Sequence, residues 1–161
     1  MLSLNGMLLG LAMAIAPSAL LASDLVAAHD LKADAIEASG KGLPILLLYT
    51  ASYCHYCASV KAEVYYPMNA DPAYQTRVLL REVEIDSAGS IRGFDGESFS
   101  HHEFAKARGI TIVPTLEIVD ERGAALVAPL IGSGVPDFYG FYVDQGIDKA
   151  LLKINTRKDA S

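Results

Sequence analysis

The sequence predicts a single α/β domain, and three observations support this. The chain has 161 residues, about the size of one domain, and 52% of them are hydrophobic, which is enough to form a core. The continuous apolar run at residues 44–49 is typical of a strand buried on both faces. Segments with helical spacing of apolar residues alternate with this run and three further expected strands. No internal repeat or linker interrupts the pattern, so we expect one domain over residues 24–161.

Composition and charge exclude several classes of protein. A disordered chain would need far fewer hydrophobic residues, because it could not repay its ordering entropy by burial. The formal net charge of −6 argues against binding of nucleic acid, which requires clustered cations. Two cysteines are too few for a disulfide scaffold, so we expect them to carry chemistry.

Residues 1–23 have the pattern of a secretory signal peptide. No charged side chain precedes Asp24, and the apolar core Met7–Ile15 is followed by small residues. This order predicts cleavage near Ala22 or Ser23 and export, for example to the periplasm. An uncleaved membrane anchor is the alternative, because Leu2–Leu21 is almost long enough to span a bilayer.

The first half of the domain is expected to alternate helix, strand, helix, strand. Capping residues, glycines and Pro67 set the boundaries, since proline breaks a helix interior and glycine favours helix ends. The expected elements are a helix capped by Ser23-Asp24 and ended by Gly40 and Gly42, a strand at 44–49, a helix from Cys54 to Tyr66, and a strand at 78–85.

The second half is expected to begin with a loop over residues 86–99. Ser100 and Glu103 then form a capping box that opens a short helix ending near Arg108. The remaining expected elements are a strand at 110–119 interrupted at Pro114, a turn at 120–123, a strand at 125–131, and a helix with Pro136 at its first position.

The motif Cys54-His55-Tyr56-Cys57 lies between the first strand and the second helix. Unpaired backbone N–H groups and the dipole at a helix start would stabilise a thiolate on Cys54. Cys57, one turn further in, would be shielded and able to attack a mixed disulfide. The motif therefore predicts a pair that exchanges disulfides.

The two cysteines have two alternative uses, a structural disulfide and a zinc site. A structural disulfide closing so short a loop would remove only about 2 kcal/mol of chain entropy, against about 4 for a 60-residue loop. A zinc site would need two further ligands, for which His101 and His102 are candidates. Successive side chains on a helix diverge by about 100°, which makes a shared metal difficult for adjacent histidines.

The segment Val113-Pro114 offers a second candidate site. A proline at a strand start is tolerated, and an X–Pro bond adopts the cis form at modest cost. A cis bond would leave the backbone groups of the preceding residue free to pair with an extended peptide. An ordinary trans proline at a strand start is the alternative.

Together these segments resemble the thioredoxin superfamily. Gly42–Cys57 is similar to its strand, active-site loop and helix, Val113-Pro114-Thr115 to its cis-proline loop, and Leu130-Ile131-Gly132 to its last strand. The resemblance covers about residues 25–152 and implies a thioredoxin fold, with a central mixed four-stranded sheet flanked by helices. Within the superfamily the chain looks most like exported bacterial thioredoxins associated with sulfur oxidation and cytochrome c maturation.

The resemblance also implies residue roles and partners. Cys54 would be the attacking cysteine, Cys57 the resolving cysteine, and Val113 and Pro114 the peptide-binding loop. The cysteine pair would be the only redox group, with no metal and no other cofactor. Expected partners are protein thiols and disulfides and a membrane electron donor of the disulfide-reductase type, without nucleic acid, and the protein is expected to be a monomer.

This sequence departs from the family pattern at several positions. Tyr53 replaces the usual tryptophan before the first cysteine and keeps an aromatic wall, and Tyr56 is expected to be a further supporting residue of the site. Leu48 stands where thioredoxins carry a buried aspartate, and Glu82 where they carry a lysine. Our hypothesis is that Glu82 accepts the proton of Cys57, directly or through water. The alternative is a solvated strand residue.

The four histidines have simpler expected roles. His55, if protonated, would add positive charge beside Cys54 and make the disulfide more oxidising. The alternative is an exposed loop histidine without such a role. His101 and His102 are expected at an exposed helix start, and His29 on an exposed face.

The sequence therefore predicts an exported thiol–disulfide oxidoreductase that reduces protein disulfides. An oxidase or isomerase would use the same chemistry in the other direction. A copper- or zinc-binding module using the same cysteines, or a redox-inert interaction domain, would have no turnover.

Overall fold

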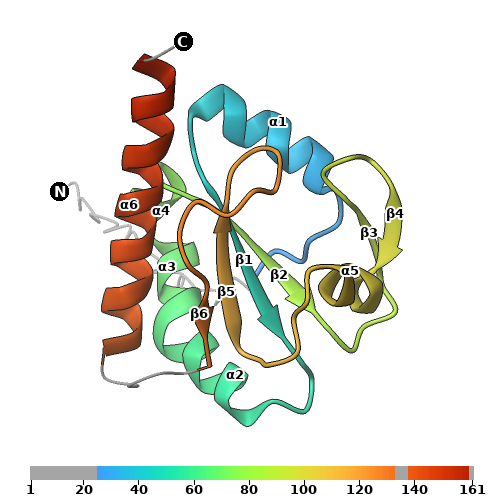
Figure 1. Cartoon of the computed structure of the whole chain (residues 1–161). Coiled ribbons are helices and arrows are strands. Elements are labelled where there is room, and N and C mark those ends of the chain that lie inside the picture. Colours follow the sequence, from blue (N-terminus) through green and yellow to red (C-terminus); the bar gives the residue numbers. More distant parts are fainter. Residues whose placement is uncertain (1–24, 133–137, 160–161) are drawn as a thin grey trace, which may run out of the picture.

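A mixed four-stranded sheet forms the centre of the protein (Figure 1). The computed structural model describes residues 25–132 and 138–159. The strand order is β2-β1-β5-β6, with β1 (Ile45–Thr50), β2 (Leu79–Glu84), β5 (Thr115–Val119) and β6 (Leu130–Ile131). Strand β1 runs parallel to β2 and antiparallel to β5, and β6 runs antiparallel to β5. The predicted strands at 44–49 and 78–85 are confirmed.

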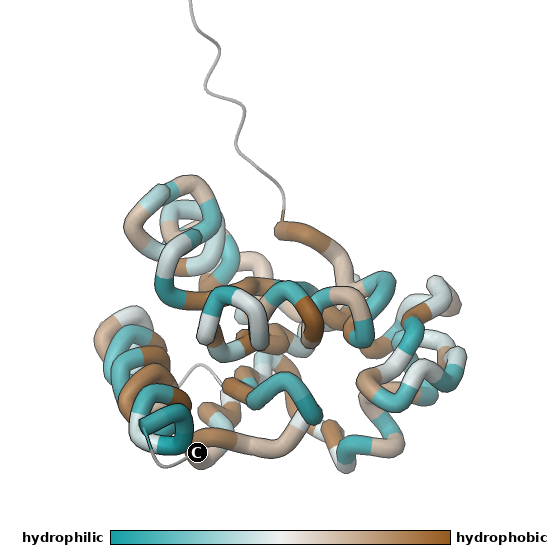
Figure 2. The backbone as a smooth tube through the Cα atoms, turned by 90° about the horizontal axis from the view of Figure 1, so that it is seen from above, coloured by the Kyte–Doolittle hydropathy of each residue, from teal (hydrophilic) through white to brown (hydrophobic). Residues whose placement is uncertain are grey.

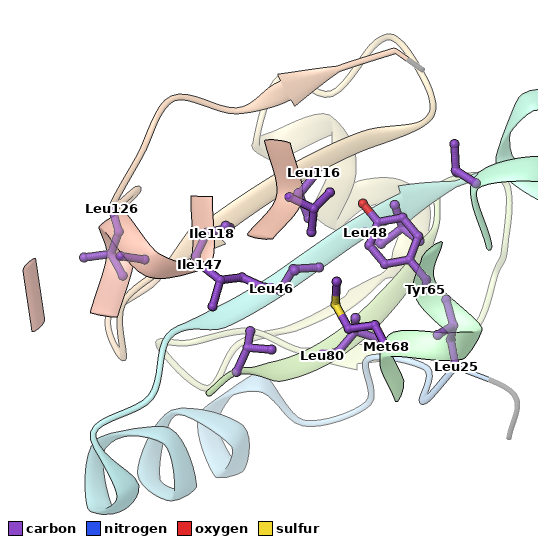
Figure 3. Close-up of a cluster of buried hydrophobic side chains, with 14 of the residues drawn as sticks. Leu25, Leu46, Leu48, Tyr65, Met68, Leu80, Leu116, Ile118, Leu126 and Ile147 are labelled. Atoms are coloured by element: carbon purple, nitrogen blue, oxygen red, sulfur yellow. The ribbon is translucent and has the colours of Figure 1, made fainter. Parts of the chain in front are cut away.

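All six residues of β1 are buried because helices cover both faces of the sheet. Side chains alternate between the faces along a strand. Leu46 and Leu48 therefore join the core that contains Tyr65 and Met68 (Figure 3). Ile45, Leu47 and Tyr49 join the core on the opposite face. Viewed from above, the hydrophobic segments run along the sheet between the two helical layers (Figure 2).

One face of the sheet carries a long helical segment after the cysteine motif. It comprises α2 (His55–Val60), the π-helix η1 (Lys61–Tyr65), α3 (Tyr66–Ala70) and, after a break at Asp71, α4 (Pro72–Gln75). The prediction that Pro67 ends the helix is wrong. Pro67 lies inside this continuous helical segment, two residues after the π-helix η1, whose hydrogen bonds run from residue i to residue i−5. The regular i to i−4 ladder, in which a proline would remove a hydrogen bond, is therefore already interrupted next to this position.

Helices α1 (Leu31–Lys41) and α5 (His101–Ala107) cover the opposite face. The predicted end of α1 is confirmed, since Gly42 closes it in the left-handed conformation at φ 71°. Its predicted start is wrong, because Asp30 caps the helix by accepting the N–H of Ala33 at 2.9 Å. The proposed cap Ser23-Asp24 lies outside the described residues.

The chain before α1 is extended because it pairs with the outer edge of β2. Ala28 donates its N–H to the Glu82 carbonyl at 2.8 Å, and Glu82 donates its own to Val26 at 2.9 Å. This pairing satisfies the backbone groups that a helix would otherwise satisfy internally. It also covers the outer edge of the sheet over these residues.

The predicted loop at 86–99 contains a hairpin, which corrects that expectation. Strands β3 (Ser90–Arg92) and β4 (Ser98–Ser100) pair in antiparallel register. Each strand alternates polar and apolar residues, but over only three positions, which is too short for the alternation to predict a strand. Burial of Ile91 anchors the hairpin against the α1 and α5 side of the sheet. The predicted capping box of α5 is confirmed.

The two later strands are shorter than predicted. Strand β5 begins at Thr115 rather than at residue 110, and β6 contains only Leu130–Ile131 rather than 125–131. Pro114 and Pro129 precede these strands, and proline has no N–H to donate to the ladder. The predicted turn at 120–123 is confirmed, with the Gly123 N–H on the Asp120 carbonyl at 2.9 Å.

The last helix, α6 (Tyr139–Asp159), packs on the same face as α2 and η1. The predicted first residue Pro136 and the predicted signal segment 1–23 lie outside the described residues. Within residues 25–132 and 138–159, no helix has the length and apolar character required to cross a membrane.

Candidate active site

The two cysteines form a disulfide at the start of α2, just after the loop that follows β1. Their Cα atoms are 5.2 Å apart, and Cys54 is the N-cap residue of α2. The Cys54 N–H donates to the Ala51 carbonyl at 3.0 Å, which closes the turn after the strand. Cys54 is partly exposed, whereas only 1% of Cys57 is exposed. A partner can therefore reach the first sulfur more readily than the second.

A backbone donor points at the more accessible sulfur. The Cys57 N–H donates to Cys54 Sγ at 3.1 Å. An N–H held at this place would stabilise a negative charge on Cys54 after reduction, because hydrogen bonds favour the charged form of an acid. The geometry suits Cys54 as the attacking group and Cys57 as the resolving group.

Asp86 anchors the loop that leads into the cysteine motif. Its carboxylate accepts the Ser52 N–H at 3.1 and 3.2 Å and also the Ser52 hydroxyl. These hydrogen bonds hold the pKa of Asp86 below its ordinary value. Sequence reasoning missed this residue, although an aspartate two residues after the end of β2, which is parallel to β1, is placed to reach the loop that follows β1.

The Val113-Pro114 loop lies at the same end of the sheet as the cysteines. Thr115 pairs with Tyr49 in antiparallel register, so the loop before Pro114 and the loop after β1 leave adjacent strands side by side (Figure 1). The Val113–Pro114 bond is cis, and the Pro114 carbonyl accepts the Gly132 N–H at 2.8 Å. Pro114 is buried and Val113 half-buried.

Glu82 lies in a polar network beneath the cysteine-bearing helix. Its Oε1 accepts hydrogen bonds from Thr50 Oγ1 at 2.6 Å and from Lys61 Nζ at 3.0 Å. The Glu82 and Lys61 side chains are 16% and 25% exposed, so this is a largely buried ion pair. Glu82 is therefore not the solvated strand residue that was its alternative interpretation.

Lys61 links this network to the resolving cysteine. The Lys61 N–H donates to the Cys57 carbonyl, which places the two residues one turn apart on the same face of the helix. Burial acts to lower the pKa of Lys61, but the hydrogen bond and charge of Glu82 raise it above its ordinary value. Lys61 and Thr50 were missed from the sequence, although the four-residue spacing from Cys57 was a usable signal for Lys61.

The aromatic residues of the motif lie on the surface. Tyr53 is 74% exposed and Tyr56 is 64% exposed. His55 is also exposed, and its ring meets the Tyr56 ring edge to face at 6.3 Å. These three side chains form the outer rim of the site around the half-exposed Cys54.

The expectation that His101 lies at an exposed helix start is wrong. Only 4% of His101 is exposed, and its Nδ1 accepts the Glu84 N–H at 3.1 Å. Burial lowers the pKa of His101. His102 and His29 are exposed. Within the described ranges, no group of three or more histidine, cysteine, aspartate or glutamate residues is arranged to hold a metal ion.

Comparison with known proteins agrees with this geometry. The profile of the thioredoxin-like domain matches residues 31–133. The chain belongs to the thioredoxin-like family. No curated protein matches the sequence. With its Cys54–Cys57 pair, this thioredoxin-like chain is a thiol–disulfide oxidoreductase.

Solved structures confirm the thioredoxin fold. Oxidised thioredoxin O2 from Arabidopsis thaliana is 19% identical with a TM-score of 0.50, over 77% of this chain and 96% of that chain. The oxidoreductase DsbH is 14% identical with a TM-score of 0.51, over 84% of this chain and 94% of that chain.

Proposed function

We propose that this thioredoxin-like protein is an exported reductase of protein disulfides. The observation that carries the proposal is the asymmetry of the pair: an accessible Cys54 that accepts a backbone N–H, and a buried Cys57 behind it. Thiol–disulfide exchange needs such an order, because the attacking sulfur must meet the substrate and the resolving sulfur must meet only the mixed disulfide.

The cycle transfers two electrons to the substrate. The Cys54 thiolate attacks one sulfur of a substrate disulfide, and the other substrate sulfur leaves as a thiolate. The Cys57 thiolate then attacks Cys54 Sγ, the bond from Cys54 to the substrate breaks, and the second substrate sulfur leaves. The products are a substrate dithiol and the oxidised Cys54–Cys57 pair.

Glu82 is proposed to accept the Cys57 proton before the second step, directly or through one water. Its two described hydrogen bonds both end on Oε1, which leaves Oε2 as an acceptor. Lys61 and Thr50 would hold the carboxylate in place, since both donate to it from positions next to the site. Val113 and Pro114 would pair with the extended substrate backbone beside Cys54.

The direction of transfer is proposed from the charge around Cys54. A strongly stabilised thiolate makes a dithiol pair an oxidant, as in DsbA. Here the positive charge of the nearby Lys61 is neutralised by Glu82. The hydrogen bond described for Cys54 Sγ comes from a single backbone N–H group, that of Cys57. This arrangement favours a reducing pair. In an oxidising compartment such as the periplasm, a membrane electron donor of the disulfide-reductase type would have to reduce it again.

Equilibration of the pair with a series of glutathione buffers tests the direction. A reduction potential near about −270 mV, the value of thioredoxin, supports a reductase. A value near about −180 mV or higher, as in protein disulfide isomerase and DsbA, would replace that proposal by an isomerase or oxidase.

Turnover itself is tested by reduction of insulin with dithiothreitol as the electron source. Catalysis is expected for the wild type and its loss for Cys54→Ser. Absence of catalysis in the wild type, together with bound copper or zinc in protein purified without chelator, would instead identify a metal-binding module.

A further inference from the structure

Exposed apolar side chains are concentrated at the active-site end of the molecule. Of the ten large hydrophobic residues exposed in the described part of the chain, seven lie at this end. Four surround the cysteines and the Pro114 loop: Tyr53, Tyr56, Ile112 and Ile131. The other three, Phe138, Phe141 and Tyr142, form an aromatic patch at the start of α6 and are 56%, 57% and 49% exposed.

The aromatic patch lies on the solvent side of α6. The opposite side of the helix packs into the core, where Tyr139, Val143 and Ile147 are buried. Phe141 and Tyr142 meet edge to face with ring centroids 5.8 Å apart. Helical side chains tilt toward the N-terminus of their helix, which here is the end that faces the active site (Figure 1).

Contacts with η1 hold the start of α6 beside the helical segment that carries the cysteines. Tyr139 shares a hydrogen bond of 2.9 Å with Tyr65, and a side chain at Gly140 would touch Val64. Tyr65 follows Cys57 by two helical turns, which is about 12 Å along the helix axis. An extended peptide covers that distance with about four residues.

We propose that the aromatic patch extends the docking surface of the active site and binds apolar residues of the protein whose disulfide reacts with Cys54. This inference rests on the proposed function. The occupant follows from continuity: a polypeptide held at Cys54 and Pro114 continues over the surface within a few residues of its cysteine. Clustered exposed aromatics mark protein contacts, because water solvates them poorly. A small disulfide such as oxidised glutathione would not reach them.

The test uses two synthetic peptides, each with one intramolecular disulfide. One carries leucine and phenylalanine three to six residues to either side of its cysteines, and the other carries serine at those positions. Pre-reduced full-length protein is mixed with each peptide, and the rate constant of exchange is measured under second-order conditions. The double variant Phe138→Ser/Phe141→Ser is compared with Ile36→Ser, which removes an even more exposed apolar residue from α1.

The wild type and Ile36→Ser are expected to react about tenfold faster with the apolar peptide, the usual effect of one aromatic anchor. Phe138→Ser/Phe141→Ser is expected to lose this preference while reducing Ellman's reagent at the wild-type rate. Equal rates of the wild type with both peptides, or an unchanged preference in the double variant, would overturn the docking proposal. So would a wild-type dimer in light scattering that the double variant abolishes, because the patch would then bind a second copy.

The two proposals fail in different ways. If the wild type reduces neither peptide nor Ellman's reagent, the thiol chemistry of the proposed function is lost and the patch has no redox partner. If Ellman's reagent is reduced normally and only the peptide preference is missing, the oxidoreductase stands and the docking proposal alone is wrong.

Discussion

At the residue scale, the carboxylate described beneath the cysteine-bearing helix lies on β2, whereas the resemblance to thioredoxins implies a buried acid on β1. Leu48 fills the position of the usual aspartate on β1, and its register partner on β2 is Glu82. Lys61 supplies the opposite charge from the helix above. A Glu82–Lys61 ion pair, contributed by β2 and η1, is therefore present beneath the cysteine-bearing helix.

Replacing Glu82 by glutamine is expected to slow the resolving step. Positioned acid–base groups contribute about a hundredfold or more to proton transfer, so the rate of release from the mixed disulfide should fall by about that factor. Stopped-flow measurement of this rate against pH is the readout, because loss of the acceptor should also change the pH profile. Glu84→Gln on the same strand serves as the control. An unchanged profile in Glu82→Gln would remove Glu82 from the mechanism.

His55→Ala is expected to raise the pKa of the Cys54 thiol and make the pair more reducing. A positive charge on the imidazole, where it is protonated, would stabilise the thiolate, and each unit of change in the pKa of the thiol corresponds to about 30 mV if only the reduced form is affected. Thiolate absorbance in the ultraviolet during a pH titration measures the change. His102→Ala, also exposed but on α5, is the control. Equal Cys54 pKa values in wild type and His55→Ala would leave His55 as a loop residue without influence.

At the element scale, local signals predicted some boundaries well and others poorly. The six-residue run of β1 was predictable because it is apolar throughout, and α5 because Ser100 and Glu103 form a complete box. Helix α1 began later than predicted because its preceding residues bond to β2, a contact distant in sequence. Local patterns do not encode such pairings.

The same distinction applies to the candidate site. Short motifs and family resemblance predict the cysteine pair, Pro114 and Glu82 as site residues. They do not predict Asp86, Thr50 and Lys61, since the contribution of these residues depends on which loop, strand and helix meet in space. The hairpin at β3 and β4 was likewise missed because its residues are mostly polar and glycine-rich.

The capping box of α5 gives a stability prediction. Ser100→Ala removes the acceptor for the Glu103 N–H, now at 3.1 Å, and the hydroxyl bonded to the Glu103 side chain. The free energy of unfolding should fall by about 1 kcal/mol, as for other N-cap serines. The free energy of unfolding is measured by unfolding in urea. Ser98→Ala on β4 is the control and should change this free energy by less than about 0.5 kcal/mol. Equal losses in both variants would contradict a specific capping role.

At the scale of the whole molecule, His101 makes stability depend on pH. It is buried between the start of α5, the end of β2 and the segment before α1, where it meets the Glu84 N–H and the Ala28 backbone. The charges that reach it are those of His29 and Glu82. Burial, the largest effect, together with His29, outweighs the opposing effects of Ala28 and Glu82 and lowers the pKa of His101.

Because the folded pKa of His101 is lowered, its contribution is complete above the unfolded pKa of about 6.5 and is lost as pH falls through the folded value. Unfolding in urea at about pH 7 and about pH 5 should show a loss on the order of 1 kcal/mol, the worth of one buried hydrogen bond. His101→Gln should flatten this dependence, and the exposed His102→Gln should leave it unchanged. A wild-type stability independent of pH over this range would refute the assignment.

The pairing of Val26 and Ala28 with Glu82 limits how far the amino end of the chain can be shortened. Removal of a leader at Ala22 or Ser23 would leave this pairing intact, with only a few residues remaining before Val26. A protease cut after Ala28 would remove the segment that pairs with the outer edge of β2. The unpaired N–H and C=O groups of β2 could then pair with a strand of a neighbouring molecule. Trimming of the amino end is therefore expected to be tolerated up to Leu25 and to promote aggregation beyond Ala28.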